Sequence, residues 1–199
     1  LCLLPDRYGY DYGRVRVAPA FPHDAATPVF RCRAAPATPL PERNVSVVWG
    51  AGLDLAPVDL GDESQIRWLE ALVWPGEEYR LPLLRAACEI ARADPPRVVK
   101  GDLRVDLPKL ATQAPGDATL VVFHTAVLAY VADPAEREQF ARGVQALDAV
   151  WIANEGPEMI PGVPAEIIGT RAPSDDFLMC VDGHPVAWAD GHGSWIDWR

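Results

Sequence analysis

The sequence predicts an α/β fold in which a mostly parallel sheet carries helices on both faces and ends in an antiparallel hairpin. Short β-branched or apolar runs alternate with segments whose apolar residues recur at the three-to-four spacing of one helix face. Such alternation favours parallel strands joined by crossover helices. The last two apolar runs are separated by Asp182-Gly183, a dipeptide typical of a hairpin turn.

The first half of the chain begins with an irregular region and continues into the alternating core. Residues 1–43 are rich in Tyr, Arg and Pro and predict irregular β-structure and loop, whereas the core is expected over residues 44–199. In this half we expect a strand at 45–49 that ends at Gly50-Ala51-Gly52, a helix capped by Asp62, and a helix over 77–93.

The second half alternates more regularly. Asp133 is expected to cap a helix, because Pro134 follows it and Glu136 stands where a capping box requires an acid. The run at 119–123 is continuously apolar or β-branched, which predicts a strand buried on both faces. The other expected elements are a strand at 97–100, a helix over 107–114, a strand at 149–153 and hairpin strands at 177–181 and 186–189.

Length and composition indicate one domain spanning residues 1–199. Of the 199 residues, 49% are hydrophobic and 23% charged, as in globular proteins, and the chain can bury a core without a metal or disulfide. The net charge of −10 disfavours nucleic acid and anionic membrane surfaces as partners. No apolar run approaches the roughly 20 residues of a membrane-spanning helix.

Cysteine usage and the N-terminal sequence predict a cytoplasmic protein. The cysteines are Cys2, Cys32, Cys88 and Cys180. None is paired at metal-binding spacing. Because three of them sit among apolar neighbours, buried thiols in a reducing compartment are favoured over a disulfide, and no signal peptide is visible. Asp190-Gly191-His192 lacks the spacing of a metal site, so we expect a tight turn there and no bound metal. Without an initiator Met, the chain is expected to be a fragment or a processed form.

Acidic residues follow the first two core strands, in the position where α/β sheets usually bind ligands. Asp54 lies just after the first strand, and a carboxylate there can accept hydrogen bonds from both hydroxyls of a ribose. Alternatively, the acids of this segment only cap the helix that follows. Asp102 and Leu103 come after Gly101 at the end of the second strand. Asp102 can accept from an exocyclic amine, or can be a turn residue bonded to its own backbone.

Two further candidates follow the next two strands. His124 stands where a catalytic or substrate-orienting group would face the ligand crevice, and histidine exchanges protons near neutral pH. The alternative is a histidine bonded to a neighbouring carbonyl group at the sheet edge. Glu155 is a candidate for a polar or cationic group of the substrate, with a structural role in a loop as its alternative.

Several segments resemble those of a bacterial family, common in high-GC genomes, that is known only as a domain of unknown function. The resemblance covers essentially the whole chain. It is carried by Leu3-Leu4-Pro5-Asp6-Arg7-Tyr8-Gly9-Tyr10-Asp11-Tyr12-Gly13, Gly52-Leu53-Asp54-Leu55-Ala56-Pro57-Val58-Asp59, Trp68-Leu69, Val73-Trp74-Pro75, residues 121–130, Glu155-Gly156 and Asp190-Gly191-His192-Gly193-Ser194-Trp195.

The order of strands and helices in this family is similar to that of the Rossmann-like class I S-adenosylmethionine-dependent methyltransferases. This resemblance implies that Asp54 holds the ribose, that Asp102 with Leu103 meets the adenine, and that the strand end at His124 faces the reacting centre. It also implies that a first strand and a Gly-rich loop belong before Leu1, so that this chain lacks them.

The resemblance and the strand-end residues together lead to the hypothesis of an S-adenosylmethionine-dependent methyltransferase that acts on an unknown small molecule. His124 or Glu155 would serve as the base, and most of the catalysis would come from positioning the acceptor. The alternative is a non-catalytic relative that keeps the fold as a binding or interaction module. A nicotinamide-dependent enzyme is a third, weaker hypothesis, because the family's Gly-rich segment does not match a dinucleotide fingerprint well.

Overall fold

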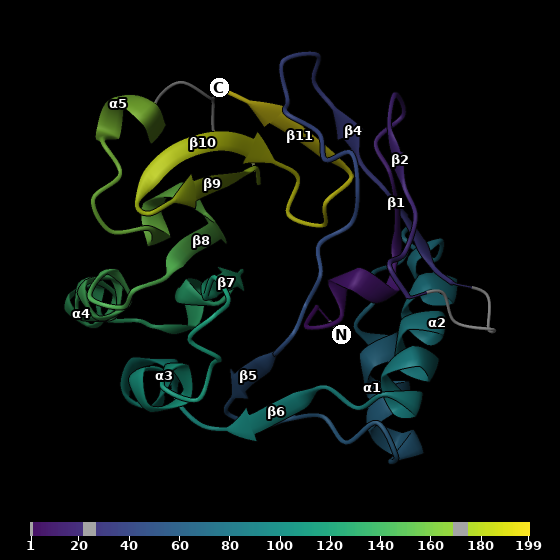
Figure 1. The fold of residues 1–199 in the computed structure, drawn as a ribbon. Helices are drawn as coiled ribbons and strands as arrows, with labels where there is room; N and C mark the ends of the chain where they lie inside the picture. Colours follow the sequence, from purple (N-terminus) through teal and green to yellow (C-terminus); the bar gives the residue numbers. More distant parts are fainter. Residues whose placement is uncertain (1, 22–26, 169–174) are drawn as a thin grey trace. The chain divides into compact units, whose positions relative to one another are not determined.

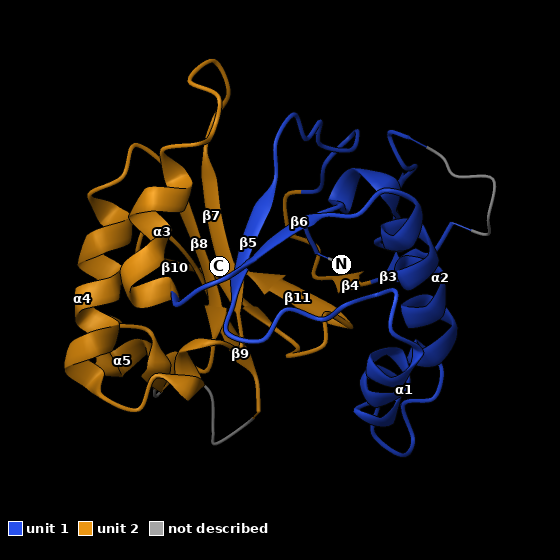
Figure 2. Ribbon diagram, turned by 90° about the horizontal axis from the view of Figure 1, so that it is seen from below, with its two compact units in different colours: residues 1–31, 40–102 blue, residues 32–39, 103–199 orange. Residues whose placement is uncertain are grey.

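The computed structural model describes residues 2–21, 27–168 and 175–199. The chain divides into two compact units, which Figure 2 shows in different colours. Unit 1 comprises Leu1–Arg31 and Leu40–Asp102, and unit 2 comprises Cys32–Pro39 and Leu103–Arg199.

The described residues of unit 1 form two small sheets and two helices (Figure 1). Its elements are the 3-10 turn η1 (Pro5–Arg7), β1 (Gly9–Asp11), β2 (Arg16–Val17), β3 (Val29–Arg31), β5 (Ala51–Asp54), α1 (Glu63–Ala71), α2 (Arg80–Ala93) and β6 (Arg97–Lys100). The three-stranded sheet has the order β2-β1-β3, and β5 pairs with β6 in parallel.

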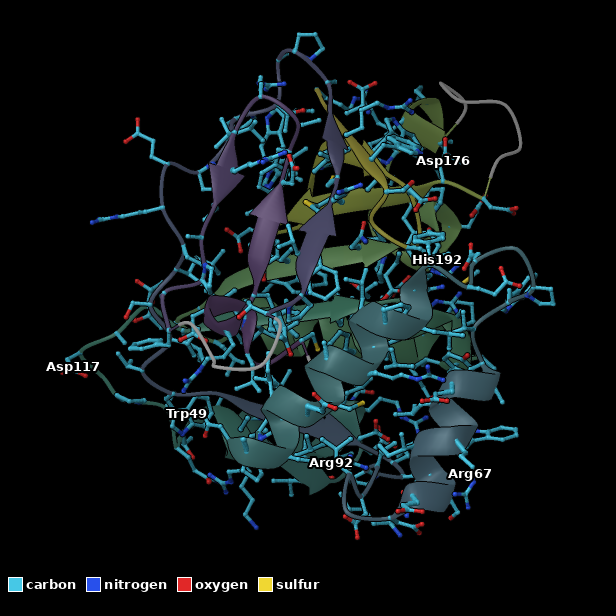
Figure 3. The ribbon with its side chains drawn as sticks, turned by 90° about the vertical axis from the view of Figure 1, so that its right-hand side faces the viewer. Trp49, Arg67, Arg92, Asp117, Asp176 and His192 are labelled. Atoms are coloured by element: carbon cyan, nitrogen blue, oxygen red, sulfur yellow. The ribbon has the colours of Figure 1, made fainter. Side chains whose placement is uncertain are left out.

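The interior of unit 1 is built from α2, from Tyr8, which directly precedes β1, and from aromatic residues of the three-stranded sheet. Tyr8, Ala87 and Ile90 are buried together, and the ring of Tyr8 meets that of Phe30 edge-on with 5.3 Å between centroids. Arg92 of α2, labelled in Figure 3, donates from Nε to the carbonyl oxygen of Leu60 at 2.6 Å. This bond ties α2 to the loop that precedes α1.

Unit 2 is built on one six-stranded sheet of order β4-β11-β10-β9-β8-β7. Its elements are β4 (Arg33–Ala34), α3 (Leu103–Ala111), β7 (Val121–Thr125), η2 (Leu128–Tyr130), α4 (Pro134–Gln145), β8 (Val150–Glu155), η3 (Pro157–Met159), α5 (Ala165–Ile168), β9 (Phe177–Val181), β10 (His184–Ala189) and β11 (Trp195–Trp198). The pairs β7–β8 and β4–β11 are parallel, and the pairs β8–β9, β9–β10 and β10–β11 are antiparallel.

The core of unit 2 lies between the sheet and its helices. Figures 1 and 2 show α3, α4 and α5 on one side of the sheet. Phe140 and Val144 of α4 pack there on Trp151 and Leu178. Along β8, buried residues alternate with half-buried ones, so that Trp151 and Glu155 share the face that the helices cover.

The predicted α/β class is confirmed, but the sheets are mixed instead of mostly parallel. The antiparallel hairpin is present, with Asp182 and Gly183 both at positive φ (50° and 79°) as its turn requires. β11, which the sequence did not predict, extends the sheet beyond that hairpin. In unit 2, the described helices lie on one face of the sheet and not on both.

Two predicted strands were wrong in position or burial. The strand expected at 45–49 lies instead at 51–54. A β-carbon at Gly52 would come within 3.1 Å of Leu3 Cδ1, so this glycine allows the strand to lie against Leu3. Gly52 therefore lies inside the strand and does not end it. The run expected to be buried on both faces forms β7 at the edge of its sheet, where Phe123 is 43% exposed.

Helix starts were predicted well where a cap defines them. Asp62 accepts from the backbone N–H of Ser64 at 2.8 Å, and Asp133 accepts from that of Ala135 at 2.9 Å. The helix expected over 107–114 begins earlier, at Leu103. Among the described residues, no helix has both the length and the apolar composition needed to cross a lipid bilayer.

Replacing Gly183 tests the hairpin turn. Gly183→Ala is expected to lower the free energy of unfolding by about 1–2 kcal/mol, because an L side chain is strained at a φ of 79°. Gly143→Ala is the matched control: it lies inside α4 with no atom near the added β-carbon, and should raise stability by about 0.5–1 kcal/mol. Urea denaturation gives the free energy of unfolding of each variant. Equal stabilities of Gly183→Ala and Gly143→Ala would contradict the assignment of the turn.

Candidate functional site

The carboxyl ends of β5 and β6 bring two predicted site residues to one edge in unit 1. The strands pair in parallel, with Asp54 opposite Lys100. The N–H of Gly101 continues the pairing by donating to the carbonyl oxygen of Asp54 at 3.0 Å. Asp54 ends β5 and Asp102 follows β6 by two residues, so both acids lie at the same edge of this two-stranded sheet.

The two acids differ in their surroundings. Asp54 is exposed, and its Oδ1 accepts from the N–H of Ala56 at 2.8 Å in a local turn. The other carboxylate oxygen keeps the capacity to accept hydrogen bonds from a ligand. Asp102 is half-buried. Leu103, the first residue of α3, packs against the buried core of unit 2, and its predicted contact with a cofactor stays a prediction.

In unit 2, His124 of β7 and Glu155 of β8 are brought into direct contact. His124 Nδ1 lies 2.6 Å from Glu155 Oε1. The parallel register places His124 opposite Ala153, and Glu155 lies on the same face two residues farther along β8. Both residues were expected from the sequence as site candidates, but their pairing was not predicted.

Glu155 is fully buried, with 0% of its surface exposed, and its carboxylate is surrounded by donors. Besides the histidine ring, the backbone N–H of Val127 donates to Oε1 at 2.9 Å and that of Leu128 donates to Oε2 at 3.2 Å. These N–H groups come from the turn at the start of η2, where Ala126 has a φ of 55°. The carboxylate therefore fixes a strained turn at the end of β7.

Trp151 completes the cluster, although it was not among the site residues expected from the sequence. Its indole Nε1–H donates to His124 Nε2 at 2.9 Å. A buried tryptophan N–H usually has a hydrogen-bond acceptor, so the sequence could have indicated that Trp151 needs an acceptor nearby. Nothing in the sequence identified His124 as that acceptor.

The cluster consequently occupies both ring nitrogens of His124. Indole is only a donor, so Nε2 accepts and Nδ1 carries the proton that is shared with Glu155. In this arrangement the ring is neutral and has no lone pair free to take a proton from a substrate. The catalytic roles predicted for His124 and Glu155 stay predictions, and for His124 that role would require the Trp151 indole to move away.

The turn at Asp190 acts as a structural element. Its Oδ2 accepts from the backbone N–H groups of His192 (labelled in Figure 3) and Ser194, at 3.1 and 3.0 Å. Burial acts to raise the pKa of Asp190, but the hydrogen bonds from Ser194 and His192 outweigh it and lower the pKa. Within the described ranges, no three His, Cys, Asp or Glu residues are grouped so that they could hold a metal ion.

The cysteines whose surroundings are described are all free thiols. Cys180 is buried in the core of unit 2, and burial raises its pKa to about 11, so this thiol is protonated at neutral pH. A protonated, inaccessible thiol is a poor nucleophile, and Cys180 therefore contributes packing.

Replacing Glu155 tests the buried cluster. Glu155→Gln should lower the free energy of unfolding by about 1–3 kcal/mol, because the new amide group can offer one oxygen but must place its NH₂ against an N–H donor. Glu89→Gln, at an exposed position of α2, is the control and should stay within about 0.5 kcal/mol of the parent. Denaturant unfolding gives both free energies of unfolding. If Glu155→Gln were as stable as the parent, the carboxylate would not be needed for the stability of the cluster.

The comparisons with known proteins identify one family. The model of a family described as "uncharacterized protein conserved in bacteria (DUF2332)" matches residues 1–198. Neither the search of curated proteins nor the search of solved structures found a match to the chain. Because the family model spans nearly the whole sequence, the chain belongs to this bacterial family.

Proposed function

We propose that the edge formed by the carboxyl ends of β5 and β6 binds the nucleoside part of S-adenosylmethionine. The protein would transfer the methyl group of this cofactor to a small molecule. The observation that carries this proposal is the position of Asp54 and Asp102 after two paired parallel strands. Open α/β sheets bind ligands beyond the carboxyl ends of such strands.

The chemistry of the two acids fits the two ends of a nucleoside. The carboxylate of Asp54 offers oxygens at a spacing that suits the adjacent hydroxyls of a ribose, and its exposure leaves it accessible. Asp102 would accept from the exocyclic amine of adenine. The similarity that we expect between the family's order of strands and helices and that of class I methyltransferases implies the same two roles. The reaction itself would depend on holding the acceptor in line with the methyl group.

Calorimetric titration with S-adenosylmethionine tests this proposal. We expect binding in the micromolar range by a chain extended N-terminally through the Gly-rich segment that the resemblance implies. In that chain the affinity should be about 5- to 150-fold lower for Asp54→Asn, since a charged hydrogen bond contributes about 1–3 kcal/mol. The amide keeps an oxygen for the N–H of Ala56, so the local turn is preserved. Asp102→Asn should weaken binding as well.

Glu42→Gln is the matched control, because Glu42 is an exposed acid of unit 1 outside the proposed site. It removes the same charge and should leave the affinity unchanged. Equal affinities for the parent and Asp54→Asn would remove Asp54 from the site. No heat at millimolar S-adenosylmethionine would contradict the proposal as a whole.

A non-catalytic binding module is the second candidate function. It is favoured by the closed cluster in unit 2, in which Glu155 is buried under three donors and both nitrogens of His124 are occupied. Neither side chain offers an accessible base there. This candidate gains support if the chain folds but neither binds S-adenosylmethionine nor transfers its methyl group.

A further inference from the structure

We propose that His124 is a pH-sensitive lock that holds Trp151 to the edge strand β7 only while its ring is neutral. The proposal concerns the internal cluster of unit 2 and does not depend on cofactor binding. It rests on the two hydrogen bonds of the ring, to Glu155 Oε1 at 2.6 Å and from Trp151 Nε1 at 2.9 Å.

The arrangement of donors selects a single protonation state of the ring. Trp151 Nε1 always carries its hydrogen, so the bond to it requires a lone pair on His124 Nε2. Glu155 receives two backbone N–H groups as well, and therefore acts as an acceptor toward Nδ1. The neutral ring with its proton on Nδ1 satisfies both neighbours at once.

Protonation of the ring disrupts the hydrogen bond at Nε2, to Trp151, but not the one at Nδ1, to Glu155. It would place an N–H on Nε2 directly against the indole N–H, with 2.9 Å between the nitrogens. A ring flip does not relieve the conflict, because both nitrogens of an imidazolium are donors. The bond to Glu155 is retained and gains charge, so the bond that must break is the one to Trp151.

The indole has no ready substitute partner once that bond is lost. Trp151 is only 1% exposed, so its N–H cannot turn to water without a movement of side chains. Its backbone is fixed by Asp182, which accepts from the N–H of Trp151 at 2.8 Å and donates to its carbonyl oxygen at 2.8 Å. His124 lies on the edge strand with 8% of its side chain exposed, so the histidine side of the contact is the one that can move.

The other groups around the ring are apolar or already engaged. Phe140 of α4 meets the His124 ring edge-on at 5.5 Å between centroids, and η2 contributes the N–H of Leu128 to Glu155. In the described part of the chain, Glu155 is the one charged group hydrogen-bonded to the ring. The charged residues of α4 have partners of their own: Glu136 with Arg104, Glu138 with Arg142, and Arg137 with the carbonyl oxygens of Val131 and Ala132.

Nuclear magnetic resonance of the full chain labelled with ¹⁵N-tryptophan tests the lock directly. The indole N–H signal of Trp151, assigned by its loss in Trp151→Phe, is followed from about pH 8 to about pH 5. His124→Gln is the matched variant, because an amide can accept from Trp151 and donate to Glu155 but does not titrate. The other histidines of the chain remain in it.

On acidification, the Trp151 indole hydrogen of the parent should exchange with water faster. We expect this acceleration to be about tenfold larger in the parent than in His124→Gln, because breaking a hydrogen bond worth about 1.4 kcal/mol changes protection by a factor of ten. Identical pH profiles in the two proteins would overturn the proposal. So would an indole signal in the parent that keeps its position and exchange rate at the acid end.

Thermal unfolding gives a second measurement that does not need His124→Gln to fold. The conflict between the indole N–H and an N–H on His124 Nε2 exists only while the indole is present, so acidification should destabilise the parent more than a variant without that donor. Trp151→Phe lacks the donor, and its melting temperature should fall by about 2–4 °C less than that of the parent over the same pH range. An equal fall in both proteins would overturn the proposal.

Discussion

The burial of the Glu155 carboxylate is the constraint on which much of unit 2 depends. A carboxylate removed from water costs several kcal/mol unless donors replace the lost hydration. The ring of His124 and the backbone N–H groups of Val127 and Leu128 supply those donors. The turn after β7 must therefore present two N–H groups toward one side chain, and the positive φ of Ala126 lies directly before them. The acid thus determines how β7 ends and where η2 begins.

Trp151 extends this constraint across the sheet. Its indole contacts β7 through His124, and its backbone contacts the hairpin turn through Asp182, so one residue of β8 connects the edge strand with the turn between β9 and β10. Phe140 packs edge-on against both the His124 and the Trp151 rings. Because each group in the cluster has one arrangement that satisfies its neighbours, a change of charge at the histidine ring affects the whole cluster.

Local signals in the sequence predicted local structure, and contacts between distant segments set the rest. The caps at Asp62 and Asp133 and the turn at Asp182-Gly183 depend on adjacent residues, so the sequence was sufficient to predict them. The strand at 51–54 is defined by its pairing with the distant segment Arg97–Lys100, and its glycines were taken for a strand end. Likewise His124 and Glu155 were recognisable as strand-end residues, but their pairing required the register of β7 with β8.

The same topological rule produces two different outcomes in the two units, and solvent access distinguishes them. Parallel pairing brings Asp54 and Asp102 to one strand-end edge, and it brings His124 and Glu155 to another. Asp54 is exposed with an oxygen still able to accept, which suits recognition of a polar ligand. Glu155 is buried, and its donors come from its own unit, which suits stabilisation of the fold. A strand-end acid is therefore a strong ligand candidate only where the protein has not already supplied its donors.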